Sequence, residues 1–108
     1  MTSLALRGLG RLAIAAAISL CLSGARAEES EIHIDNFTFE PKELTVKVGT
    51  TVTWKNRDDI PHTVVSAGKF RSKPLDTDDS FAFTFAAAGE YKYFCSLHPH
   101  MTGMVKVE

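Results

Sequence analysis

The amino-acid sequence predicts an all-β domain, folded as a β-sandwich or a flattened barrel. Apolar and polar residues alternate along several short stretches, which is the pattern of half-buried strands. Turn-forming residues such as Gly49, Pro74 and Gly89 separate these stretches at close spacing. About seven or eight short strands in one small domain are typical of sandwiches and barrels.

The first predicted strand contains Ile32 and Ile34, and its alternation places His33 on the solvent side. The later predicted strands cover 44–48, 52–55, 62–66, 81–85, 91–94 and 103–107. Residues 66–80 are polar and interrupted by glycine and proline, so we expect a surface connection there. The run 86–88 is too short for a helix before Gly89 and is expected to be a loop.

Residues 1–27 have the layout of a cleaved secretory signal peptide. Arg7 and Arg11 precede the apolar run 12–22, and an A-x-A pattern ends at Ala27. The apolar run is shorter than the roughly 20 residues that span a bilayer, which argues against a membrane anchor. We therefore expect export to the periplasm, no stable membrane insertion and one mature domain, 28–108.

The charge and cysteine content of this mature domain exclude several classes of function. Residues 1–27 carry three arginines and no acid, which leaves nine basic against thirteen acidic side chains, a net charge of −4. No basic patch for nucleic acid remains. Cys95 becomes the single cysteine, so a disulfide within the domain is impossible. Its open roles are an intermolecular disulfide, a reactive thiol or a metal ligand.

Four residues form a candidate metal site. Cys95, His98 and Met101 recur at every third position in a loop between two predicted strands, and His62 follows the turn 58–61. Two imidazoles, one thiolate and a weak thioether are the ligands of a blue-copper site. Structural zinc sites instead use four firm cysteine or histidine ligands. We therefore expect one copper ion, cycling between Cu(I) and Cu(II), at these four residues.

A second methionine, Met104, also follows His98 closely. By alternation it shares a strand face with Lys106, opposite the buried face of Val105 and Val107, so it is expected to point away from the metal.

Two further groups are weaker candidates for metal binding. His33 is expected at the surface, and the acids 76, 78 and 79 lack the glycine and closing glutamate of a calcium loop.

The chain resembles the cupredoxins, and most closely the amicyanin-like small blue-copper proteins. The resemblance lies in the segments 36–41, 52–56, 61–62, 89–95 and 98–101. It implies a two-sheet Greek-key sandwich with copper near one end, held by His62, Cys95 and His98 in the equatorial plane and by Met101 as the axial ligand. It also implies periplasmic electron transfer with transient redox partners.

The sequence departs from the family pattern at two positions. Thr63 stands where the family usually has an asparagine that steadies the ligand loops, and His100 stands where amicyanin-like members tend to have an aromatic residue. The family docks its partners through an apolar patch, to which Pro61, Leu97 and Pro99 correspond. His100 would make this patch more polar.

The function expected from these features is that of a one-electron carrier rather than an enzyme. The chain would act as a monomer between periplasmic partners such as a dehydrogenase, a cytochrome or another cuproprotein. The alternative is a periplasmic copper carrier or buffer that delivers Cu(I) to a cuproenzyme. The ligand types suit both functions.

Overall fold

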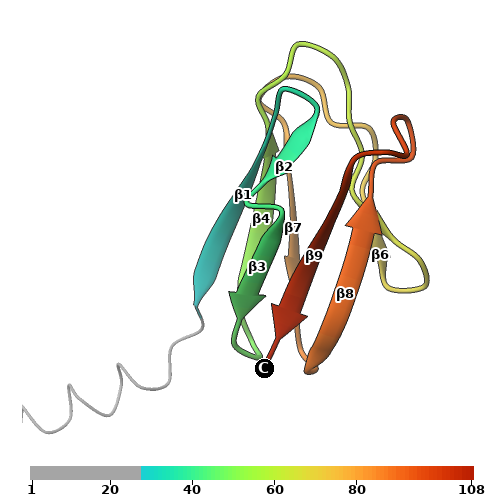
Figure 1. Cartoon of the computed structure of the whole chain (residues 1–108). Coiled ribbons are helices and arrows are strands. Elements are labelled where there is room, and N and C mark those ends of the chain that lie inside the picture. The colour runs from blue at the N-terminus through green and yellow to red at the C-terminus, as the bar shows by residue number, and fades with distance from the viewer. Residues whose placement is uncertain (1–27) are drawn as a thin grey trace, which may run out of the picture.

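The computed structural model describes residues 28–108, which form two β-sheets packed face to face (Figure 1). The predicted signal peptide, 1–27, lies outside the described residues. The strands are β1 (Glu29–Asp35), β2 (Thr38–Glu40), β3 (Glu43–Val46), β4 (Thr51–Asn56), β5 (Val65–Ser66), β6 (Phe70–Arg71), β7 (Ser80–Thr84), β8 (Gly89–Phe94) and β9 (Thr102–Val107). No helix among residues 28–108 is long and apolar enough to cross a membrane.

One sheet has the strand order β2-β1-β4-β7, and the other has the order β3-β9-β8-β5-β6. The pairs β1–β4 and β3–β9 are parallel, whereas all other paired strands are antiparallel. The chain changes sheet after β2, β3, β4, β6 and β7, as a Greek-key sandwich requires. The predicted fold class is therefore confirmed, with nine strands among the described residues rather than seven or eight.

The core lies between the two sheets, where the alternating apolar residues of each sheet meet. Val52 and Trp54 of β4 are fully buried, and so is Val105 of β9. The Trp54 ring meets the Tyr93 ring of the opposite sheet edge to face, with centroids 5.3 Å apart. The period-two pattern thus identified the inward faces of β4 and β9 correctly.

The connection 66–80 differs from its prediction. Phe70 and Leu75 are buried in the core, and Phe70 packs against Trp54 at 5.6 Å and Phe83 at 4.7 Å between ring centroids. The segment also contains β6, and Leu75 forms an isolated bridge with His62. The burial of these two residues could not be predicted, because isolated apolar residues in a polar segment show no alternating pattern.

Three strand boundaries were also predicted wrongly. Val48 lies in the turn after β3 and is 50% exposed, because the chain reverses at Gly49 with a φ of 95°. The predicted strand 62–66 is reduced to β5, although all five residues are buried. Gly103, predicted to begin the last strand at a turn, is a buried residue inside β9, paired with Tyr93.

Tyr93 is a buried phenol without a hydrogen bond. Its side chain is 2% exposed, and neither its hydroxyl nor the Trp54 indole Nε1 has a hydrogen-bond partner among the described residues. Burial raises the pKa of Tyr93 to about 12, more than the nearby Trp54 lowers it. The phenol therefore stays protonated throughout the range in which an exposed tyrosine ionises.

This phenol should make the domain less stable at high pH. The unfolded chain releases the Tyr93 proton near pH 10, whereas the folded domain keeps it up to about pH 12. The unfolded state then binds fewer protons, so the free energy of unfolding should fall by about 1.4 kcal/mol per pH unit in that range. Denaturant unfolding from pH 9 upward measures this slope. Tyr93→Phe should remove one such increment from the slope. A slope in Tyr93→Phe equal to that of wild type would contradict the assignment.

Candidate metal centre

The four predicted ligands all lie at one end of the sandwich. His62 follows the loop after β4, Cys95 comes directly after β8, and His98 and Met101 belong to the loop between β8 and β9. Figure 1 shows these loops together at the end of the molecule opposite the C-terminus. Strands distant in sequence therefore bring His62 to the other three residues.

The nitrogen and sulfur donors converge on one point. The Nδ1 atoms of His62 and His98 each lie 3.7 Å from the Cys95 sulfur, and the three ligand atoms lie within 4.8 Å of one another. His62 and Cys95 are completely buried, whereas His98 is half-buried. Cys95 is a free thiol. One soft donor and two imidazole nitrogens thus face a common centre that only His98 connects to the surface.

The ligand loop is closed by its own backbone. The His98 N–H donates to the Cys95 carbonyl at 3.2 Å, and the Met101 N–H donates to the His98 carbonyl at 2.9 Å. The Cys95 N–H in turn donates to the Met101 carbonyl at 3.1 Å. Each turn spans three residues, which is the structural origin of the sequence rhythm. Met101 is 5% exposed and packs in the same core cluster as Cys95.

Met104 lies away from this cluster, as its position in the strand predicted. It is half-buried on the outer side of β9 and lines a surface cavity with Lys42, Lys92 and Phe94. Gly103, Val105 and Val107 occupy the buried positions of the same strand. Met101 is therefore the methionine that provides a buried thioether in the ligand loop.

Thr63 connects the two ligand segments. Its N–H donates to the Cys95 sulfur at 3.3 Å, and its hydroxyl oxygen lies 3.7 Å from that sulfur. The same oxygen accepts the Ser96 N–H at 2.7 Å and lies 2.8 Å from the Ser96 hydroxyl. A hydroxyl can accept two hydrogen bonds and donate one, so Thr63 can accept both from Ser96 and donate to sulfur. The departure from asparagine therefore leaves the two loops joined.

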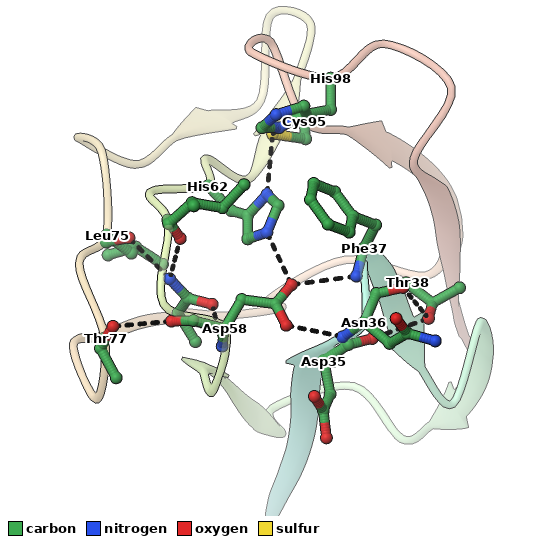
Figure 2. A network of polar contacts seen from close by, with 12 residues as sticks. Asp35, Asn36, Phe37, Thr38, Asp58, His62, Leu75, Thr77, Cys95 and His98 are labelled. Carbon is green, nitrogen blue, oxygen red and sulfur yellow. Dashed lines mark hydrogen bonds and ion pairs between the residues drawn. The ribbon is translucent and has the colours of Figure 1, made fainter.

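Asp58 is a site residue that the sequence analysis treated only as part of a turn. Its Oδ2 lies 2.8 Å from the His62 Nε2, on the side of the imidazole opposite Cys95 (Figure 2). An N–H at Nε2 that donates to this carboxylate leaves the Nδ1 lone pair free for a metal. Burial raises the pKa of Asp58, but the N–H groups of Phe37 and Asn36 and the His62 ring lower it more, so the net pKa is below its ordinary value.

Asn56 fixes the loop that carries Asp58 and His62. This buried amide donates to the carbonyls of Ile60 at 2.9 Å and Leu75 at 2.8 Å, and it accepts the Asp58 N–H at 2.9 Å. The spacing of four residues between Asp58 and His62 was the available signal for their contact. It was weak, because spacing alone does not show whether two side chains of one loop face each other.

The other sequence candidates lie apart from this centre. His33 is partly exposed and pairs with Glu31 at 2.6 Å, as expected for a surface position. His100 is exposed. Asp79 accepts the Asp76 N–H at 3.0 Å in an exposed turn. Within residues 28–108, the one cluster of histidine, cysteine or acidic side chains that can hold a metal is His62, Cys95 and His98.

A family model, that of the Cupredoxin-like domain, matches residues 9–107. The chain belongs to the cupredoxin family. The amicyanin of Paracoccus versutus is 38% identical over 88 residues, which cover 76% of this cupredoxin and 67% of the relative. The chloroplast plastocyanin of Tetradesmus obliquus is 36% identical over 110 residues, covering 86% and 74% of the two chains. A second amicyanin, from Paracoccus denitrificans, is matched over 63% of its length.

The solved structures agree with this assignment. A Cu(I) structure of an amicyanin mutant superposes on this cupredoxin with a TM-score of 0.71 at 35% identity, covering 74% of this chain and 82% of that one. The predicted resemblance to amicyanin-like cupredoxins is therefore confirmed. The donor set of a buried thiol, two imidazoles and a buried thioether fits one copper ion in a type 1 arrangement.

Proposed function

We propose that this cupredoxin is an exported one-electron carrier whose single copper is held by His62, Cys95, His98 and Met101. The observation that carries the proposal is the convergence of both imidazole Nδ1 atoms on the buried Cys95 sulfur, each at 3.7 Å. A copper ion bound there would supply a Cu(I)/Cu(II) couple, for which this mixture of soft and intermediate donors suits both oxidation states.

Different residues would hold the copper ligands in place, stabilise the sulfur and connect the centre to the surface. Asp58 and the bonded ligand loop hold the donors in place, so that little rearrangement opposes electron transfer. Thr63 donates its N–H to the sulfur and thereby stabilises negative charge on it. His98 connects the buried centre to the surface. Its neighbours Leu97 and Pro99 are exposed, as is Pro61, which supports transient docking of a partner there.

The proposed setting is the periplasm, reached after cleavage of residues 1–27. There the monomeric carrier would serve partners such as a dehydrogenase, a cytochrome or another cuproprotein. The relatives named amicyanin and plastocyanin support an electron carrier over an enzyme.

Two rates distinguish this carrier from the alternative, a protein that delivers Cu(I). We expect rapid electron self-exchange, measured by NMR line broadening in mixtures of the two redox forms. We also expect slow removal of copper by a strong Cu(I) chelator, because three of the four ligands are buried. Slow self-exchange together with rapid transfer of copper to a competing apo-protein would instead assign the chain to copper delivery.

The proposed axial ligand can be tested with two methionines. Met101→Gln should lower the reduction potential by about 60 mV or more, equivalent to a tenfold change in the redox equilibrium, because an amide oxygen favours Cu(II). Met104→Gln is the matched control and should leave the potential and the visible spectrum nearly unchanged. Voltammetry of both variants decides the matter. If Met104→Gln changes the reduction potential and Met101→Gln does not, the axial ligand is assigned wrongly.

A further inference from the structure

The turn between β1 and β2 has an unusual backbone. Asn36 and Phe37 both have positive φ angles, of 54° and 59°. Asparagine tolerates this left-handed conformation, but a bulky side chain such as phenylalanine disfavours it, and glycine is the usual residue at the second position of such a turn. A strained non-glycine residue persists only where its surroundings hold it in place.

Asp58 holds this turn and the buried imidazole together. Its carboxylate accepts the Asn36 N–H at 2.7 Å and the Phe37 N–H at 2.9 Å, and Oδ2, which accepts the latter, also contacts the His62 Nε2. Figure 2 shows the carboxylate between the turn and the ring. One side chain therefore fixes the β1–β2 turn relative to the metal centre.

The strained residue places its ring against both imidazoles. Phe37 meets His62 edge to face at 5.4 Å between centroids and 87° between planes, and it meets His98 at 5.3 Å and 82°. The ring is nevertheless 50% exposed, so burial in the core does not explain its presence. Its closest aromatic neighbours are the two histidines of the centre (Figure 2).

We propose that Phe37, held by Asp58, is a positioning residue that covers both imidazoles and slows the loss of the bound metal. Release of a metal requires a ligand to swing away, and His98 is the one proposed ligand that is only half-buried. The Phe37 ring lies against His98 and opposes that rotation, while Asp58 restrains His62 from its other nitrogen. The inference deepens the proposed function and rests on it, since retention of copper is what an electron carrier needs.

Phe37→Gly separates this role from simple structural support. Glycine relieves the left-handed strain, so the metal-free variant should unfold at the same or a higher denaturant concentration than wild type. Removal of Cu(I) by a chelator should nevertheless be roughly tenfold faster, because two aromatic edge contacts are lost. Phe37→Tyr should retain the slow wild-type rate. Val48→Gly, which removes another half-exposed apolar side chain from a turn, should also release copper at that rate.

Two outcomes overturn the proposal. One is a wild-type release rate in Phe37→Gly, and the other is a metal-free Phe37→Gly that is clearly less stable than wild type, which would make the ring a structural support.

A second measurement needs no metal. In the apo-protein, Asp58→Asn should shift the imidazole proton resonances of His62 and His98 and speed hydrogen exchange of the Phe37 amide by roughly tenfold, because a charged acceptor is lost. Asp59→Asn, at the exposed neighbouring position, should do neither. An unchanged Phe37 amide in Asp58→Asn would remove Asp58 from the proposal. Failure of the wild-type protein to bind copper would contradict the proposed function. The measurements on the apo-protein would still test whether Asp58 holds Phe37 against the two imidazoles.

Discussion

Replacing Cys95 with serine should abolish the intense visible absorption of the copper(II) form while leaving the sandwich folded. The absorption of a blue site arises from charge transfer between thiolate sulfur and copper, and a serine hydroxyl offers neither the sulfur nor the charge. The fold should survive, because the aromatic core around Trp54 and Tyr93 is untouched and the substitution nearly conserves volume. We expect nearly complete loss of the band.

Absorption of the copper(II) protein, compared with its far-ultraviolet circular dichroism, measures both parts of this prediction. Ser96→Ala is the matched control, because it alters the neighbouring residue and its contact with Thr63 but keeps the thiolate. That variant should stay coloured with a modest shift. A wild-type protein that binds copper(II) yet remains nearly colourless would contradict a type 1 site.

The metal centre could be predicted from sequence largely because three of its four residues lie in one short loop. Cys95, His98 and Met101 need no tertiary information to be brought together, since a loop of this length closes on itself through its backbone. His62 could be included among the ligands because a second imidazole completes the donor set of a blue-copper site and because this residue follows a turn. Likewise, the strands that could be predicted well, such as β4 and β9, have one buried and one outer face and so carry a period of two.

The parts that could not be predicted depend on contacts between distant segments. Phe70 and Leu75 are buried anchors in a polar connection, and strands of two residues are too short for any period. The contact of Asp58 with Asn36 and Phe37 joins positions more than twenty residues apart. The position of Phe37 could not be predicted either, because nothing in the local sequence reveals that its backbone is left-handed.

Gly103 illustrates the same limit and has a large expected effect. A Cβ added at this position would overlap the Tyr93 ring at Cζ and Oη, far inside normal contact distance. The two residues are paired across β8 and β9, and the ring cannot move aside, because it is 2% exposed and packs against Trp54 and Phe39. Glycine stands inside this strand because another residue's ring occupies the space of its side chain.

Gly103→Ala should therefore destabilise the domain by about 3 kcal/mol, the upper part of the usual range for overpacking a core. Chemical denaturation of the metal-free protein measures this loss. Gly68→Ala is the comparison: open space surrounds that exposed position, and only its φ of 74° opposes a side chain, so its cost should be about 1 kcal/mol. Tyr93→Leu replaces the ring by a shorter side chain and should relieve the overlap. The Gly103→Ala/Tyr93→Leu double variant should therefore lose less stability than the sum of the losses in the two single variants. Strictly additive losses would mean that Gly103 is required by the strand backbone and that the Tyr93 ring is not what excludes alanine.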